Sequence, residues 1–321
     1  MFIKRLTKPI ELEATEALFR RVHPDHPSKP MLQIDLRKRI SGYQGEKSIE
    51  YPLKFLKNRY RIFQSLRLPN DVDSRFQIDA TLASQYLIFL ISVKNIRSEL
   101  EINHGTGQMI QKADGQEFVY DDPDIQIQHH LFQFRDWLRR NRFPSTPIVP
   151  LIVFTDPTTI LRFNGNADHF RHYILKSQLH LKIFELEKAY TKIALSQQDI
   201  RRLTVELLKQ HSDPHYPILE LYKIRPEDIL TGVHCPNCGF LPMKRIFGKW
   251  LCVKCQSTSR MAHASALKDY ALLLGNTITN AQCRRFLHVN TPTQTTNILS
   301  TMNLKYIGKT KGRVYYLDSL K

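Results

Sequence analysis

Residues 76–94 read FQIDATLASQYLIFLISVK and contain two apolar segments separated by a short polar step. Both segments, 76–83 and 86–95, are rich in β-branched and aromatic residues, and Ser84-Gln85 between them indicates a hairpin turn. The same reading predicts further strands at 60–68, 99–103 and 147–156. A mixed sheet is therefore expected at the centre of the first half of the chain.

Helical spacing predicts the elements that flank this sheet. One helix is expected from Asp124 through Arg140, and another over 173–211 with a break near Ser196. The apolar face of the first contains Leu131, Phe134, Trp137 and Leu138. Residues 1 to about 40 also have mostly helical spacing, interrupted by HPDHPSKP (23–30). The predicted fold class is α/β (α+β), a mixed sheet flanked by helices.

The chain is strongly basic. It has 321 residues, with 47 Lys and Arg against 30 Asp and Glu, so its formal net charge is +17. Residues 233–321 hold 13 Lys or Arg and 2 Asp or Glu, about two thirds of the excess. Such a surface attracts polyanions, of which nucleic acid is the commonest in a cell; a membrane surface is the alternative.

Several features favour a reducing, cytoplasmic location without a membrane segment. The opening MFIKRLTKPIELEATE is charged where a secretory signal would be apolar. The longest apolar stretch, 86–93, is too short to span a bilayer. Of five cysteines, four fall in one metal-ligand pattern and Cys283 stands alone, most simply as a small core residue.

Two CxxC motifs predict a zinc ribbon. Cys235, Cys238, Cys252 and Cys255 form two pairs separated by 13 residues. Each CxxC turns two thiolates toward one point, and two such pairs supply the four ligands of a tetrahedral Zn²⁺. The intervening MKRIFGKWLC reads as a hairpin with residues 247–249 at its tip. Because four sulfur ligands leave no open position, the expected role is structural, and His234 and His263 are expected to be bystanders.

The ribbon carries basic residues that suit phosphate contact, although a solvated face would look the same. These residues are Lys244, Arg245, Lys249 and Lys254.

The C-terminal part has the order of a winged helix-turn-helix. Three helices are expected in ALKDYALLL, TNAQCRRFL and PTQTTNILSTMNL, the last capped by Thr291, followed by a hairpin in YIGKTKGRVYYL. The third helix would present Thr293, Gln294, Thr296 and Asn297 to a groove of DNA, while Lys309, Lys311 and Arg313 would meet phosphate. A helical cap that packs on the ribbon or forms a dimer contact is the alternative.

An acid and a lysine mark possible chemistry in the first half. Asp79 lies in Gln77-Ile78-Asp79 on one predicted strand, and Lys94 ends the next. Adjacent strands that end near each other bring such groups to one point. Carboxylates there bind Mg²⁺ and position water for attack on a phosphodiester, while the lysine orients or activates the water. Taken singly, each residue could equally be an ordinary strand-end side chain.

The order of these motifs resembles the NERD (nuclease-related domain) family, a branch of the PD-(D/E)xK nuclease-like fold. The similarity runs through Gly45-Glu46, Gln77-Ile78-Asp79, Val93-Lys94-Asn95, Pro123 with Gln126, and PIVPLIVF. It is greatest to Bacillus-type members that add a zinc ribbon and a winged-helix tail. The resemblance implies that Glu46 and Asp79 belong to the active site, that Lys94 is catalytic and that Gln126 supports it.

Ser92 departs from the family pattern. Relatives carry Glu at this position, in E-V-K rather than S-V-K, and that carboxylate normally ligates the metal. A serine hydroxyl is neutral and a weak ligand for a hard divalent cation, so metal binding is expected to suffer. Glu46 could supply part of the missing charge, as could Glu99 or Glu101 if the chain folds back.

Five segments are expected along the chain. They are an N-terminal helical extension (1–40), a nuclease-like core (41–160), a helical connection (161–232), the zinc ribbon (233–260) and a winged-helix-like module (261–321). The expected function is nucleic-acid binding, to DNA in preference, with a metal site that Ser92 in place of the family Glu is expected to have made degenerate. The alternatives are an active Mg²⁺- or Mn²⁺-dependent DNA nuclease, and a non-enzymatic DNA-binding scaffold or regulator.

Overall fold

A computed structural model describes residues 1–214 and 216–320, apart from the side chain of Lys311. The chain forms two compact units. The first contains residues 1–7 and 40–214, and the second contains residues 8–39 and 216–320. The finer division into five segments remains a prediction.

A six-stranded mixed sheet forms the centre of the first unit, in the order β1-β2-β3-β4-β8-β10. β2, β3 and β4 are antiparallel neighbours, whereas β1, β8 and β10 each pair in parallel. The strands are β1 (Phe2–Lys4), β2 (Arg61–Pro69), β3 (Arg75–Ala83), β4 (Ile88–Lys94), β8 (Ile148–Phe154) and β10 (Tyr173–Leu175). The strands expected at 60–68, 76–83, 86–95 and 147–156 are confirmed to within two residues at each end.

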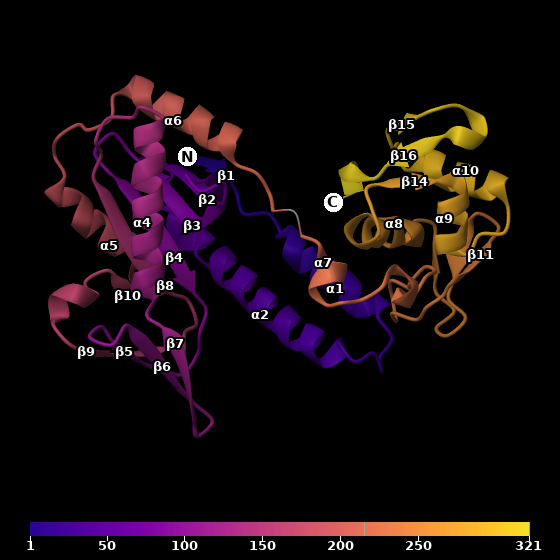
Figure 1. Cartoon of the computed structure of the whole chain (residues 1–321), viewed down its shortest axis with the longest axis horizontal. Helices are drawn as coiled ribbons and strands as arrows, with labels where there is room; N and C mark the ends of the chain where they lie inside the picture. The colour runs from indigo at the N-terminus through magenta and orange to yellow at the C-terminus, as the bar shows by residue number, and fades with distance from the viewer. Residues whose placement is uncertain (215, 321) are drawn as a thin grey trace. The chain divides into compact units, whose positions relative to one another are not determined.

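Helices cover both faces of this sheet, which is why β4 reads as a continuous apolar run. On one face, α4 (Pro123–Arg140) and α6 (Gln197–Gln210) pack on Ile88 and Leu90 (Figure 1). On the other face, α3 (Glu50–Lys54) and α5 (Leu179–Leu186) pack on the strand residues that alternate with these and point to the opposite side. The predicted apolar face of α4 is confirmed, because Leu131, Phe134, Trp137 and Leu138 are all buried.

The helix expected over 173–211 is wrong at its start. Residues 173–175 pair in parallel with Ile152–Phe154 as β10, and the long-range pairing overrides the local helical spacing. The expected break is real, since α5 ends at Leu186 and α6 begins at Gln197 after the Ser196 cap.

A second, four-stranded sheet lies in the same unit, in the order β7-β6-β5-β9. Its strands are β5 (Glu99–Asn103), β6 (Gln108–Ala113), β7 (Gln116–Asp121) and β9 (Ile160–Asn164). Leu100, Ile102 and Met109 of this sheet share a buried cluster with Ile127 of α4 and Phe154 of β8. Of these four strands, the sequence predicted β5.

The helix α2 (Lys29–Ser48) begins in the second unit and ends in the first. Near its end, Gly45 packs so closely on β4 and β8 that a Cβ there would lie 2.7 Å from Asn95 Cβ and 3.1 Å from Thr155 Oγ1. A larger residue would push the helix away from the strand ends.

A buried ion pair organises the second unit. Arg21 at the end of α1 (Ile10–Arg21) is fully buried and donates to Asp269 of α8 (Ala262–Leu273) at 2.7 Å. Arg20 contacts the same carboxylate, and Arg21 also donates to the carbonyl of Leu230 at 2.8 Å. The short helix α7 (Ile218–Leu221) packs beside α1.

The rest of the second unit contains two small antiparallel sheets and two more helices. The first sheet is β11 (Lys244–Ile246), β12 (Lys249–Leu251) and β13 (Thr258–Ser259). The second, in the order β14-β16-β15, is β14 (Thr277–Thr279), β16 (Val314–Tyr316) and β15 (Tyr306–Ile307), with α9 (Asn280–Leu287) and α10 (Pro292–Thr301). The hairpin around Gly248 and the three expected helices are confirmed, whereas β14 was not predicted. Both sheets and the helices share one buried cluster.

Among the described residues, no helix combines the length and the apolar character that crossing a bilayer requires.

Candidate functional site

The predicted acid and lysine lie at neighbouring positions on β3 and β4. Asp79 Oδ2 accepts a 2.7 Å hydrogen bond from the backbone N–H of Val93, one residue before Lys94. Burial raises the pKa of Asp79, while the Val93 N–H and the charge of Lys94 oppose that rise. The carboxyl is therefore held in a poorly solvated place where a cation would stabilise its charge.

Helix α4 packs on one face of the sheet and contributes a residue that contacts Lys94. Asp122 caps the helix by accepting from Asp124 N–H at 3.0 Å, and Pro123 occupies its first turn. This start places Gln126 where its Oε1 accepts from Lys94 Nζ at 2.5 Å. Burial lowers the pKa of Lys94, and Asp79 opposes that shift.

Ser92 occupies the position between these groups along β4. Its side chain is 2% exposed and its residue pairs with Ile152 of β8. Because side chains alternate along a strand, Ser92 and Lys94 project from the same face of the sheet. The position that faces the acid-lysine pair is thus filled by a neutral hydroxyl.

Glu46 is brought to the strand ends by α2. Asn95 ties the helix to the sheet, because its Nδ2 donates to Ser41 O at 2.9 Å and its Oδ1 accepts from Thr155 at 3.0 Å. Burial lowers the pKa of Lys4 on β1, and the negative charges of Asp213 and Glu46 oppose that shift. Lys4 in turn donates to the carbonyls of Gln64 and Ser65 at 3.0 Å each.

The two other acids considered from the sequence are engaged elsewhere. Glu99 and Glu101 lie on β5 of the second sheet, where they pair with Arg162 at 3.7 Å and Lys112 at 2.8 Å. Both carboxylates thus have partners within the second sheet.

Three residues near the site were missed by sequence reasoning. His130 lies one helical turn after Gln126, and burial, followed by the charges of Lys94 and His129, lowers its pKa to about 4. Its spacing of four residues from Gln126 was the available signal. Lys4 and Thr155 are contributed by strands remote in sequence, for which no local signal exists.

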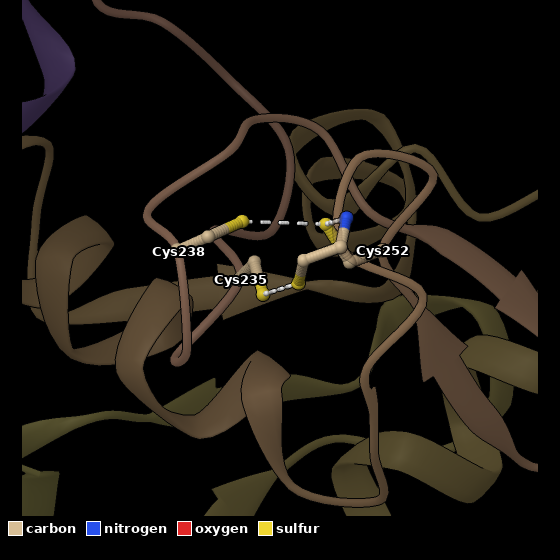
Figure 2. A group of neighbouring side chains, drawn as sticks. Cys235, Cys238 and Cys252 are labelled. Carbon is tan, nitrogen blue, oxygen red and sulfur yellow. Dashed lines mark hydrogen bonds between the residues drawn. The ribbon is translucent and has the colours of Figure 1, made fainter.

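Four cysteines form the other candidate centre. The sulfur atoms of Cys235, Cys238, Cys252 and Cys255 all lie within 4.8 Å of one another, and Figure 2 shows the first three side chains converging. Two pairs, Cys235–Cys255 and Cys238–Cys252, are 3.6 Å apart. Tetrahedral zinc with bonds of about 2.3 Å separates sulfurs by about 3.8 Å, so the group fits such an ion.

No other set of three or more histidine, cysteine or acidic ligands in the described part of the chain comes as close together. His263 is buried and its Nδ1 accepts from Trp250 Nε1 at 3.1 Å, and burial lowers its pKa to about 4. The pKa of His234 is also lowered to about 4 by burial. Neither histidine joins the four-cysteine group.

Most of the predicted nucleic-acid contacts are exposed. Lys244, Lys249 and Lys254 on the ribbon, all four residues named on α10, and Lys309 are exposed. Arg245 is half-buried, with its guanidinium 5.1 Å from the Trp250 ring centroid, and Arg313 stacks at 4.2 Å from that of Tyr306. The Thr296 hydroxyl already bonds within the fold, to Pro292 O at 3.0 Å. The side chain of Lys311 lies outside the described residues.

Part of the first unit matches a known family. Residues 41–155 fit the family model of NERD, the nuclease-related domain. This range is therefore a nuclease-related domain. It contains Glu46, Asp79, Ser92, Lys94 and Gln126. No curated protein and no solved structure matched the chain.

Proposed function

We propose that this NERD-domain protein binds nucleic acid, with DNA as the favoured form, through the basic ribbon and C-terminal module. Its nuclease-related domain has weak or no phosphodiesterase activity of its own. In this proposal the first unit contains a degenerate cleavage site, and the second unit binds the nucleic acid.

The observation that carries the loss of activity is the buried, neutral Ser92 beside Asp79 and Lys94. Mg²⁺ is held by oxygen ligands, and charged carboxylates supply most of its protein affinity. Glu99 and Glu101 pair with cations on another sheet, and Asp79 is the carboxylate that interacts with Lys94. A cation held by fewer carboxylates is bound weakly, and cleavage that depends on it is slow.

Binding is supported by the surface of the second unit. Helices α9 and α10 contain no acidic residue, and α10 presents exposed Gln294 and Asn297. The order α8-β14-α9-α10-β15-β16, with the sheet order β14-β16-β15, supports the proposal of a winged helix. In this arrangement α10 would enter a groove and Lys309 would contact phosphate.

The ribbon tip adds a second contact. Phe247 at the turn between β11 and β12 is fully exposed, and Lys244 and Lys249 flank it on the two strands. An exposed ring between cations is suited to stacking on an unpaired base while the lysines meet the backbone. In this proposal zinc bound by four thiolates holds the tip in shape and takes no part in chemistry.

Binding would be tested by fluorescence anisotropy with duplex DNA, single-stranded DNA and RNA at several salt concentrations. The triple variant Lys249→Ala, Lys254→Ala, Lys309→Ala should weaken binding and reduce the salt slope by about 0.9 for each phosphate that the protein no longer neutralises. The matched control, Lys54→Ala, Lys192→Ala, Lys209→Ala, removes equal charge from exposed positions of the first unit. Equal weakening in both triple variants, or no binding at low salt, would contradict the proposal that nucleic acid binds through this surface of the second unit.

An active Mg²⁺- or Mn²⁺-dependent nuclease is the second candidate. It is favoured by the retained Asp79 and by the 2.5 Å hydrogen bond that holds Lys94 to Gln126. Incubation of linear, circular and single-stranded DNA with each cation separates the candidates. Cleavage that disappears in Lys94→Ala would establish the nuclease, whereas binding without cleavage would support the degenerate site.

A further inference from the structure

A basic cavity of about 410 Å³ lies in the first unit, at the opposite end of the sheet from Lys94. It is enclosed by the start of β2, the turn between β3 and β4, and the first turn of α6. Its polar wall contains Lys57, Arg61, Ser84, Gln85, Gln197 and Arg201. Ala83 at its edge follows Asp79 by four residues, about 13 Å along a strand, so the cavity is separate from the nuclease-like site.

The positive charges of this cavity are largely unneutralised. Arg59 also lines it and pairs with Glu187. In the described part of the chain, no carboxylate pairs with Lys57, Arg61 or Arg201. The side-chain contact of Arg61 is a weak one, 3.9 Å from the sulfur of Met1. Like charges gathered around a concave surface raise the local concentration of anions.

The walls are fixed before any ligand arrives. The backbone N–H groups of Ala194 and Leu195 donate to Gln85 O at 2.8 and 2.9 Å, which joins the entry to α6 to the β3–β4 turn. Ser196 and Asp199 form a capping box at the start of α6, and the following helix has 14 residues. This capping box fixes the start of the helix, which carries Gln197 and Arg201 in the cavity wall.

A neighbouring cavity of about 430 Å³ shares Arg59, Tyr60, Ser84 and Gln85 with the first. It is also lined by Tyr86, Leu87 and Tyr190, and by Glu187, whose charge is paired with Arg59. Tyrosine rings stack on flat heterocycles, and their hydroxyls bond to sugar or base. Together the two cavities offer a cationic half and an aromatic half, each within the size range of small-molecule sites.

We propose that this pair of cavities binds a nucleotide, with its phosphates between Arg61 and Arg201 and its base against Tyr86. The phosphate-bearing group could belong to a free nucleotide or to the 5′ end of a nucleic-acid strand. This site is independent of nucleic-acid binding by the second unit and of cleavage at Asp79 and Lys94.

Isothermal titration of the full chain with ATP, AMP, inorganic phosphate, and 5′-phosphorylated or 5′-hydroxyl oligonucleotides tests the proposal. The double variant Arg61→Gln, Arg201→Gln should weaken nucleotide binding at least about tenfold, since it removes two charge-assisted hydrogen bonds. Lys209→Gln, on the same α6 but eight residues beyond Arg201, should leave it unchanged. Thermal melting of each variant verifies that the fold is intact.

The ligands then distinguish the two sources. Because oligonucleotides are also expected to bind the second unit, each ligand is compared by the affinity that Arg61→Gln, Arg201→Gln removes. A larger loss for ATP or AMP than for the oligonucleotides assigns the site to a free nucleotide, and a larger loss for the 5′-phosphorylated strand than for its 5′-hydroxyl form assigns it to a strand end. Tyr86→Ala should weaken nucleotides but not inorganic phosphate. Binding of inorganic phosphate alone, equal weakening in Lys209→Gln and the double variant, or no binding at all would overturn the proposal.

Discussion

Asp79 on β3 is joined to Val93 on β4 by a 2.7 Å hydrogen bond from the backbone N–H to the carboxylate. This bond fixes the acid between Ser92 and Lys94, the two β4 residues that flank Val93. The acid and the lysine thus lie close together, beside a serine that carries no charge.

The raised pKa of Asp79 makes the stability of the fold depend on pH. Burial raises its pKa, so the folded protein binds this proton more tightly than the unfolded chain. Binding of this proton makes its full contribution to the free energy of unfolding below the unfolded pKa of about 3.9. That contribution is lost as the pH rises through the raised pKa of the folded state.

Asp79→Asn keeps an oxygen for the Val93 N–H but removes the buried charge. At pH 7 its free energy of unfolding should exceed that of the wild type by on the order of 1 kcal/mol, and the difference should vanish in acid. Urea unfolding at pH 4 and pH 7 measures both values. A variant less stable than the wild type at pH 7 would mean that the ionised carboxylate is stabilised in the fold.

The close approach of α2 to the sheet predicts opposite effects for two glycines. Gly45→Ala places a methyl group 2.7 Å from Asn95 Cβ and should cost about 1–3 kcal/mol by overpacking. Gly42→Ala on the same helix meets nothing within 4 Å and should stabilise by up to about 1 kcal/mol through helix propensity. Thermal melting of both variants decides this; equal shifts would contradict the close packing at Gly45.

The four-cysteine centre predicts one zinc ion per chain that supports the ribbon core. Cys252 is fully buried in the same cluster as Trp250, so losing the metal should disturb that core. Cys252→Ser should abolish stoichiometric zinc and shift Trp250 fluorescence, because zinc binding of about 10–16 kcal/mol is coupled to folding.

Cys283→Ala, a buried cysteine outside the centre, is the matched control and should retain one zinc ion. Metal analysis after gel filtration gives the stoichiometry. Full zinc content in Cys252→Ser would show that this cysteine is not a ligand.

The buried pair of Arg21 and Asp269 predicts a large stability loss. Asp269→Ala leaves the fully buried guanidinium of Arg21 without its carboxylate and should cost about 3–5 kcal/mol. Lys268→Ala, next in sequence, breaks a more exposed pair with Glu13 and should cost less than about 1 kcal/mol. Denaturant unfolding of the two variants provides the comparison, and similar losses of stability would contradict the account.

The elements that could be predicted from the sequence are those in which apolar residues recur at the spacing of a helix or a strand. The apolar face of α4 and the runs of β3 and β4 are of this kind, and they place Asp79 near Lys94. The strand β7 could not be found, because all six of its residues are exposed and no apolar alternation marks it. β10 exists only through its pairing with Ile152–Phe154, which the local pattern of Tyr173–Leu175 does not encode.

Part of the candidate site was equally beyond local reasoning. The family resemblance assigned Gln126 a supporting role, but nothing in the sequence predicted the hydrogen bond that Lys94 donates to it. The links from Asn95 to Ser41 and Thr155, and the approach of Lys4, join residues about 54 to 61 positions apart. Such interactions arise from the tertiary fold.

The most direct test restores the missing charge. Ser92→Glu is compared with Ser92→Gln, a neutral side chain of the same size, in a plasmid-cleavage assay with Mg²⁺ and with Mn²⁺. Ser92→Asp provides a shorter acid in case the buried position rejects Glu, and melting curves verify folding. We expect a folded acidic variant to cleave at least about a hundredfold faster than Ser92→Gln, and this gain should disappear when Lys94→Ala is added. Folded acidic variants that cleave no faster than Ser92→Gln would contradict the claim that this one side chain silences the site.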